Sequence, residues 1–211
     1  MNRTKIDWAD FTWNPVVGCR GVCPYCYARR MARRFHMGRS DFLPEWSERN
    51  FNRSFPRKPS RIFVNSMSDI SDWEPIWQSR VDMRIRQHPE HRFLALSKNP
   101  EFIPATWWEI ENLLCGASVT DQRSYDRLIS RTPPRNFLSI EPILGPVKPW
   151  GIHKWIIVGA ETGNRKGRVK PKKAWLEEIW LYSRVNRIPL FFKDSLRIIW
   201  PSCLLSQEYP A

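Results

Sequence analysis

Short apolar runs recur along the chain and alternate with polar stretches. Such runs, rich in β-branched and aromatic residues, predict strands at residues 12–17, 61–66, 92–97, 113–119, 136–141, 154–160 and 189–194. Near-continuous apolar runs of this length are typical of strands that are buried on both faces of a parallel sheet. The pattern therefore predicts an α/β protein.

The polar stretches between these runs predict helices. Their ranges are 26–35, 77–87, 104–112, 122–130 and 173–186. Strands that alternate with helices indicate repeated βαβ units, in a closed or partly closed barrel or in an open doubly wound sheet, and six or seven strands favour a partial barrel. We expect one domain over residues 1–211, with a core at about 4–195 and a C-terminal tail at 196–211.

Small or polar residues follow most of the predicted strands. They are Ser66, Ser68, Asp69, Ser97, Lys98, Ser118, Glu141, Glu161, Thr162, Lys193 and Asp194. Ligands of parallel α/β folds bind beyond the carboxyl ends of the strands, where the loops converge. We therefore expect these residues to contribute to a shared site.

The charge balance is strongly basic. The net charge is +13, from 34 Lys and Arg against 21 Asp and Glu. An excess of this size attracts nucleic acids, nucleotides and other phosphates over long range. Much of it lies at 28–34, 53–61 and 164–173, where solvated helix faces and loops are the alternative interpretation.

No apolar run approaches the roughly 18 residues of a membrane span, and the first residues are polar and charged, unlike a signal peptide. We expect a cytoplasmic protein with no membrane partner. Clustered cysteines in a reducing compartment are more often metal ligands or catalytic groups than disulfides.

Three of the five cysteines lie within eight residues, as C-x3-C-x2-C at Cys19, Cys23 and Cys26. One interpretation is a zinc site completed by His36. The other is a four-iron four-sulfur cluster, in which three cysteines leave one iron open for a ligand. Cys115 is expected in the core, and Cys203 in the tail is expected to be inert.

The cysteine loop resembles the signature of the radical S-adenosylmethionine (SAM) superfamily. Its fuller sequence is similar to the loop of the spore photoproduct lyase branch: "WNPVVGCRGVCPYCYARR". Further segments resemble, in the same order, the phage-type Gp37/Gp68 (DUF5131-like) proteins: "VNSMSD", "LSKNP", "GASVTDQ", "LSIEPILGPV", "WIIVGAETG" and "PLFFKD". The similarity covers about residues 4–195. Many Gp37/Gp68 members space the first two cysteines more widely than this chain does.

The superfamily resemblance implies a partial (β/α)6 TIM-like barrel of the radical SAM type and a cluster on Cys19, Cys23 and Cys26. SAM would chelate the open iron, and its reductive cleavage would give methionine and a 5'-deoxyadenosyl radical. An external electron donor such as flavodoxin or ferredoxin is implied as a partner. Queuine lyase is a small member of the superfamily that frees the queuine base from queuosine or its phosphate.

The resemblance also assigns roles to strand-end residues. Ser66, Ser68 and Asp69 would contact the methionyl amine of SAM, and Lys98, supported by Ser97, would neutralise its carboxylate. The other residues expected near SAM are Tyr25, Ser118 and Glu141. Those expected near the substrate are Glu161 and the anion-binding residues Arg165, Lys166 and Arg168, while no catalytic residue is assigned.

The preferred function is a radical SAM enzyme that abstracts hydrogen from a nucleoside or nucleotide, with a base lyase that releases queuine as one reaction. Alternatives are DNA or RNA base repair or modification of the photoproduct-lyase type, and a zinc-stabilised nucleic-acid binder that is not an enzyme. A further alternative is a degenerate barrel that keeps its cluster for structure or sensing.

Overall fold

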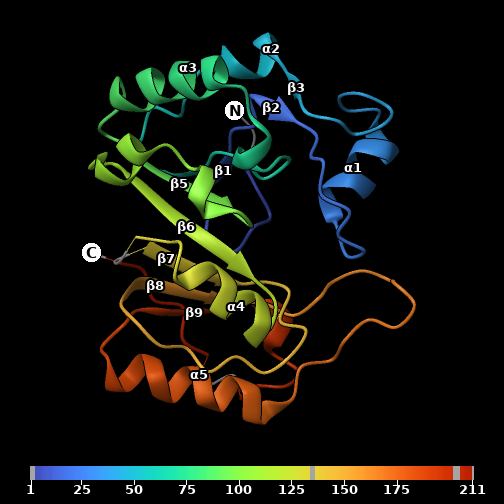
Figure 1. Ribbon diagram of the computed structural model, residues 1–211, viewed down its shortest axis with the longest axis vertical. Helices are drawn as coiled ribbons and strands as arrows, with labels where there is room; N and C mark the ends of the chain where they lie inside the picture. Colours follow the sequence, from blue (N-terminus) through green and yellow to red (C-terminus); the bar gives the residue numbers. More distant parts are fainter. Residues whose placement is uncertain (1–2, 134–135, 202–204, 211) are drawn as a thin grey trace. The chain divides into compact units, whose positions relative to one another are not determined.

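The computed structural model describes residues 3–133, 136–201 and 205–210 (Figure 1). It divides into two compact units, Met1–Cys115 and Gly116–Ala211, which are described in turn. Cys203, which is expected to be inert, lies outside the described residues, and the expectation of one domain stays a prediction.

In the first unit, β1 (Phe11–Thr12), β4 (Arg61–Phe63) and β5 (Arg92–Ser97) are neighbouring parallel strands. A separate antiparallel pair is formed by β2 (Val16–Val17) and β3 (Glu45–Trp46). The α-helices are α1 (Tyr27–Phe35), α2 (Glu48–Phe51) and α3 (Pro75–Arg86), and the 3-10 helices are η1 (Ile70–Asp72), η2 (Pro100–Phe102) and η3 (Ala105–Glu109). The segment β4-α3-β5 is therefore a βαβ unit.

The core of the first unit lies between its strands and α3. Ile62 of β4 and Phe93 of β5 pack there with Val81 and Ile85 of α3, and all four are fully buried. Cys115 lies in the same cluster, which confirms the prediction that this cysteine belongs to the core.

The strands of the second unit pair in parallel in the order β6 (Leu113–Val119), β7 (Asn136–Ile140), β8 (His153–Val158) and β9 (Leu190–Phe192). The first residues of β6 belong to the first unit. Its helices are α4 (Gln122–Ile129), α5 (Lys173–Val185) and the 3-10 helix η4 (Asp194–Leu196). The two segments β6-α4-β7 and β8-α5-β9 are again βαβ units.

One face of the second unit's strands is buried under helices. Leu138 of β7 and Ile156 of β8 share a core cluster with Tyr125 of α4 and with Leu176 and Ile179 of α5. Strand residues of this cluster alternate with residues that face the other way, as the period of two along a strand requires.

Residues 206–208 of the tail run antiparallel along the side of β9 that β8 does not occupy. The Phe192 N–H donates to the carbonyl oxygen of Ser206 at 2.7 Å, and the Glu208 N–H donates to that of Leu190 at 3.0 Å. An isolated antiparallel bridge joins Phe191 to Gln207. These bonds occupy backbone groups of β9 that β8 does not use.

The predicted α/β class with parallel strands is confirmed, and the strands predicted at 92–97 and 113–119 match β5 and β6 to the residue. The prediction of a single strand at 12–17 is wrong, because the structure has two short strands there, β1 and β2. Pro15 has no N–H to donate, and the chain there leaves β1, which pairs with β4, and enters β2, which pairs with β3. The closure into a (β/α)6 partial barrel stays a prediction.

The helix predicted at 104–112 is wrong. Only the five residues of η3 are helical, as a 3-10 helix. Ile103, Trp107 and Ile110 are buried at spacings of four and three, so this irregular segment imitates the periodicity of an α-helix.

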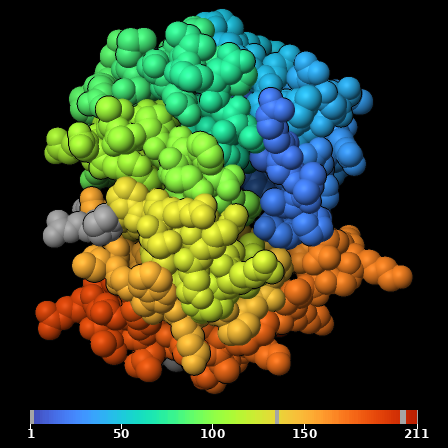
Figure 2. All heavy atoms as spheres, viewed as in Figure 1, coloured from blue at the N-terminus to red at the C-terminus, as the bar shows by residue number. Residues whose placement is uncertain are grey.

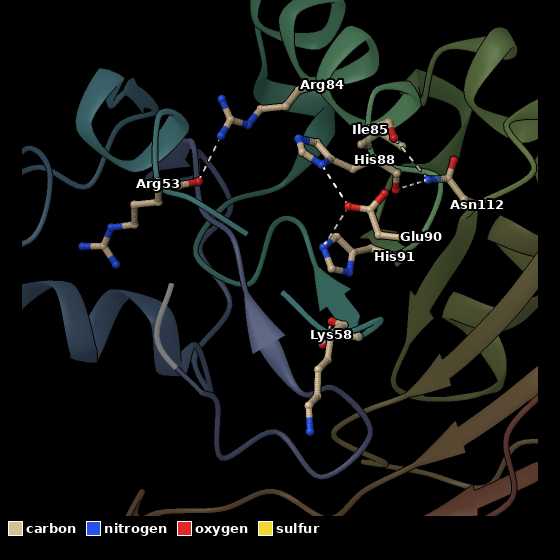
Figure 3. A network of polar contacts seen from close by, with 9 residues as sticks. Arg53, Lys58, Arg84, Ile85, His88, Glu90, His91 and Asn112 are labelled. Atoms are coloured by element: carbon tan, nitrogen blue, oxygen red, sulfur yellow. Dashed lines mark hydrogen bonds and ion pairs between the residues drawn. The ribbon is translucent and has the colours of Figure 1, made fainter. Parts of the chain in front are cut away.

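Asn112 belongs to a polar network at the amino end of β5 (Figure 3). Its side-chain Nδ2 donates to the carbonyl oxygens of Ile85 at 3.1 Å and His88 at 2.9 Å, which ties the end of α3 to the start of β6. Glu90 Oε1 lies 3.2 Å from His88 Nδ1 and 3.5 Å from His91 Nε2. A cavity of about 540 Å³ opens beside this network. The cavity lies at the strand edge opposite to the one where ligands bind in parallel α/β folds.

Among the described residues, no helix is both long enough and apolar enough to cross a membrane.

A second buried network fixes the amino ends of β7 and β8. The Tyr125 hydroxyl lies 3.0 Å from His153 Nε2, and Asn136 Oδ1 lies 3.1 Å from His153 Nδ1. Burial lowers the pKa of His153 to about 4. The folded protein therefore favours the neutral imidazole more strongly than the unfolded chain does.

We predict that His153 makes stability depend on pH. Because its folded-state pKa lies below the unfolded value of about 6.5, its contribution is complete above that pH and is lost as the pH falls towards 4. The full effect is on the order of 3 kcal/mol. Urea unfolding at pH 7.5, 5.5 and 4.5 should show a steeper loss in the natural protein than in His153→Gln. The matched control, exposed His36→Gln, should keep the natural slope; equal slopes in all three proteins would contradict the prediction.

Candidate functional site

The cysteine loop connects β2 to α1 and is anchored at its start. The Gly18 N–H donates to the carbonyl oxygen of Met67 at 3.0 Å, and the Cys19 N–H donates to that of Phe42 at 2.8 Å. Gly18 has a φ of +109°, and a Cβ at this position would lie 2.2 Å from the carbonyl oxygen of Leu43. Only glycine fits here, because both the backbone conformation and the close approach exclude a side chain.

The loop turns directly into α1. Cys26 is the N-cap residue of this helix, and its Sγ accepts a hydrogen bond from the Arg29 N–H at 3.3 Å. The Cys26 N–H in turn donates to the carbonyl oxygen of Cys23 at 3.1 Å. The predicted start of the helix at residue 26 is therefore confirmed to within one residue.

The Arg29 side chain donates hydrogen bonds to the backbone of the cysteine loop. Its Nη2 donates to the carbonyl oxygens of Cys19 at 3.2 Å and Gly21 at 2.9 Å, and its guanidinium lies over the ring of Phe42. In the sequence this arginine was counted only in the basic run at 28–34, and its role was missed. A repeated arginine pair, "ARRMARR", carries no local signal that one member points inward.

The sulfur atoms of Cys19 and Cys23 face the space beside Gly21. A Cβ on Gly21 would lie 3.2 Å from Cys19 Sγ and 4.0 Å from Cys23 Sγ, and the Gly21 N–H donates to Cys19 Sγ at 3.2 Å. Cys19, Cys23 and Cys26 are half-buried free thiols. Three thiols on one short loop, two of which accept N–H bonds, match in kind the ligands of an iron-sulfur cluster.

His36 does not join the three cysteines. It is exposed at the C-cap of α1, and the nine residues of this helix span roughly 14 Å from Cys26. Within the described ranges, no three His, Cys, Asp or Glu residues, Cys19, Cys23 and Cys26 included, are placed to hold a metal ion as they stand. The geometry therefore does not assemble a Cys3His site for a single zinc ion.

Two carboxylates lie near Cys19. Asp72 Oδ2 accepts a hydrogen bond from the Arg20 N–H at 2.8 Å. Burial of the thiol, with the charges of Asp69 and Asp72, raises the pKa of Cys19 to about 12. The thiol is therefore protonated at neutral pH, and a bound metal centre would displace that proton. Asp72 was missed, because an aspartate in a polar stretch has no distinguishing pattern.

Asp69 connects the end of β5 to η1. Its Oδ1 accepts from the Ser97 hydroxyl at 2.5 Å and from the Ser71 N–H at 3.1 Å, and its Oδ2 accepts from the Lys98 N–H at 3.0 Å. The structure thus brings together Asp69, Ser97 and Lys98, as expected from their places at the strand ends. The predicted contact of Asp69 with an amine of SAM remains untested, and its carboxylate already has these protein donors.

Lys98 reaches from the end of β5 to the cysteine loop. Its Nζ lies 5.5 Å from the ring centroid of Tyr25, within the range of a cation–π contact. Ser66 donates to Asn14 Oδ1 at 3.0 Å, and Ser68 Oγ accepts from the Trp73 indole at 3.0 Å. Both serines belong to the segment between β4 and η1.

In the second unit, Ser118, Glu141 and Lys193 lie at or just after the ends of β6, β7 and β9. Ser118 of β6 pairs with Ser139 of β7 and is half-buried. Glu141 follows β7 and accepts a hydrogen bond from Lys193 Nζ, which follows β9. Glu141 was expected near SAM, whereas Lys193 was noted only as a strand-end residue.

Glu161 follows β8 and is buried against Arg165. The Arg165 guanidinium forms a bidentate ion pair with the Glu161 carboxylate, in which Nη2 lies 2.7 Å from Oε2. Arg168 donates to the carbonyl oxygen of Gly163 at 2.9 Å, and Lys166 is exposed. These arginines therefore shape the loop at 161–172, which projects from the second unit (orange in Figures 1 and 2). Their predicted role in binding anions remains untested.

A family profile matches residues 3–197. The chain belongs to the DUF5131 family, described as a protein of unknown function. No curated protein and no solved structure matches the chain significantly. The resemblance to DUF5131-like proteins is thereby confirmed, and it extends over both units of the structure.

We predict that Gly18→Ala destabilises the first unit strongly. Gly167→Ala is the matched control, because Gly167 also has a positive φ but a Cβ added there would meet no atom within 4 Å. The control should lose about 1 to 2 kcal/mol, the cost of the left-handed conformation, while Gly18→Ala should lose clearly more because of the contact with Leu43. Urea unfolding measures both losses, and equal losses would contradict the steric explanation.

Proposed function

We propose that this chain is a radical SAM enzyme that acts on a nucleoside or nucleotide. The cysteine loop carries the proposal, because Cys19, Cys23 and Cys26 lie on a loop that is anchored at Gly18, closed by Arg29 and continued directly by α1. Three thiols would leave one iron of a four-iron cluster open. The likeness of this loop to the radical SAM signature supports the same function.

Cys19, Cys23 and Cys26 would hold the cluster, which, with SAM and one electron from an external donor, would supply radical hydrogen abstraction from the substrate. The protein's own residues bind and orient the groups. Lys98 lies at the face of Tyr25 beside the loop and would neutralise the methionyl carboxylate. Ser66, Ser68 and Asp69, which follow β4, would line the methionyl amine.

Among the strand-end residues of the second unit, Ser118 and Glu141 would meet the ribose of SAM, and Glu161 and the loop at 161–172 would meet the substrate. The net charge of +13 supports an anionic or nucleotide-type substrate. Release of a base from its ribose, as in queuine lyase, is the favoured reaction; repair or modification of a base in DNA or RNA is the alternative. The partial (β/α)6 barrel, the cytoplasmic location and an electron donor such as flavodoxin or ferredoxin belong to this proposal.

The second candidate is a nucleic-acid binder that is stabilised by zinc and has no enzymatic activity. The exposed arginines of α1, among them Arg30, Arg33 and Arg34, favour it, because such a surface attracts phosphates. The position of His36 weakens it, since the helix length separates this residue from Cys26.

We predict that anaerobic reconstitution with iron and sulfide yields a protein that forms 5'-deoxyadenosine when reduced with SAM. Cys23→Ala should abolish the product because it removes a cluster ligand, whereas Cys115→Ala, which removes a core thiol, should retain it. Iron content, the visible spectrum and chromatography of the product measure the outcome.

His36→Ala separates the two candidates in the same preparation. The radical SAM function predicts unchanged iron content and product, whereas the zinc site predicts loss of bound metal. A colourless protein that holds one zinc ion and releases it in His36→Ala would overturn the proposal.

We also predict that Lys98→Met weakens SAM binding by about tenfold, which corresponds to about 1.4 kcal/mol for one lost charge contact. Iron content should not change, because Lys98 is not a cluster ligand. Equilibrium dialysis of reconstituted protein with labelled SAM measures the dissociation constant, and Lys58→Met in the first unit is the control. Equal affinities in the natural protein and Lys98→Met would rule out this role.

A further inference from the structure

The peptide group that joins Cys19 to Arg20 is held from both sides by charged side chains. Its carbonyl oxygen, on Cys19, accepts a hydrogen bond from Arg29 Nη2 at 3.2 Å. Its N–H, on Arg20, donates to Asp72 Oδ2 at 2.8 Å. A cation lies at the negative end of this peptide dipole and an anion at the positive end, so both charges stabilise the same orientation of the peptide. We call the two side chains and the peptide between them the charged clamp.

Both side chains of the charged clamp are fixed by groups outside the cysteine loop. Asp72 is the last residue of η1 and lies between Ile70 and Trp73, which are buried in the core of the first unit. The Arg29 guanidinium carbon lies 4.9 Å from the ring centroid of Phe42, which is also buried. The clamp therefore connects the loop to two packed clusters of the first unit.

The charged clamp attaches the first residues of the loop. Arg29 Nη2 also donates to the carbonyl oxygen of Gly21 at 2.9 Å. Among the described residues, no other group outside the loop forms a hydrogen bond with the backbone of residues 20–22. Within this segment, the Gly21 N–H donates to Cys19 Sγ at 3.2 Å. The direction of this N–H towards the sulfur therefore depends on the clamp.

The two charges of the clamp lie beside a proposed ligand of the iron-sulfur cluster. The Asp72 carboxylate acts on the Cys19 thiol, and the Arg29 guanidinium is bonded to the carbonyl group of the same cysteine. The reduction potential of an iron-sulfur cluster depends on nearby charge and on N–H bonds to its sulfur atoms. A nearby negative charge opposes the addition of an electron, and a positive charge favours it. Holding a peptide needs only a donor and an acceptor, whereas the charges also act on whatever the sulfur binds.

We propose that Arg29 and Asp72 are positioning residues for the cluster. They fix the peptide that follows Cys19, and their opposite charges shift the reduction potential of the cluster in opposite directions. Both act through Cys19 and the loop backbone, without touching iron or substrate. This inference rests on the proposed function, which supplies the cluster.

Hydrogen exchange of the full chain without iron tests the positioning role. Asp72→Ala removes the acceptor, so the Arg20 amide should exchange about fivefold faster, the factor that corresponds to a net hydrogen bond of about 1 kcal/mol. Asp72→Asn keeps a side-chain oxygen that can accept from this N–H and should restore most of the protection. Nuclear magnetic resonance measures the rate at this amide. Equal rates in the natural protein and in Asp72→Ala would overturn the inference.

Redox titration of the reconstituted protein without SAM tests the role of the charges. Electron paramagnetic resonance of the reduced cluster measures the midpoint potential. Asp72→Asn should raise this potential because it removes a negative charge, and Arg29→Gln should lower it because it removes a positive one. The ion pair Asp82–Arg86 on α3 of the first unit provides matched controls. Asp82→Asn and Arg86→Gln remove the same two charges and should leave the potential unchanged.

The sign of the two shifts separates an electrostatic role from a general loss of loop structure. Shifts of the same sign in Asp72→Asn and Arg29→Gln, or an unchanged potential in Asp72→Asn, would overturn the inference. If Arg29→Gln loses its iron, Asp72→Asn still decides, because it keeps an acceptor for the Arg20 N–H. A natural protein that binds no cluster would overturn the proposed function and this inference with it, whereas a cluster whose potential ignores both charges would overturn the inference alone.

Discussion

Parallel strand pairing is the constraint on which the remaining features of each unit depend. Because the strands of a βαβ unit run in one direction, whatever follows each strand emerges at the same edge. In the first unit, this brings Asp69, after β4, against Ser97 and Lys98, at the end of β5. In the second unit, it aligns Glu141 with Lys193. Neither group requires a long or specialised loop.

Many polar side chains at these strand edges already form hydrogen bonds or ion pairs with other protein groups. Asp69 caps η1 and fixes the end of β5, and Arg165 is held by buried Glu161. Catalytic and binding groups function best when neighbouring hydrogen bonds fix their orientation, so such contacts are compatible with a site as well as with a scaffold.

The sequence predicted the elements with strong apolar runs and missed those that depend on distant partners. β5 and β6 were predicted to the residue, because continuous apolar runs define buried strands. η3 was mistaken for an α-helix, since its buried positions imitate helical spacing. Motif spacing indicated the cysteines, but Arg29 and Asp72 could not be found in this way, because their roles depend on carbonyl and amide groups that the fold brings to them.

The tail along β9 has a consequence for association between molecules. A sheet edge with unpaired N–H and C=O groups is a template on which another chain can add a strand. Ser206 and Glu208 occupy that position on β9 through their own backbone, so the strand's outer side is already paired. Residues 206–208, which lie beyond the end of the family match at 197, therefore cover this edge of β9. A version of the chain shortened to the matched region would lose this protection while keeping every cysteine of the loop.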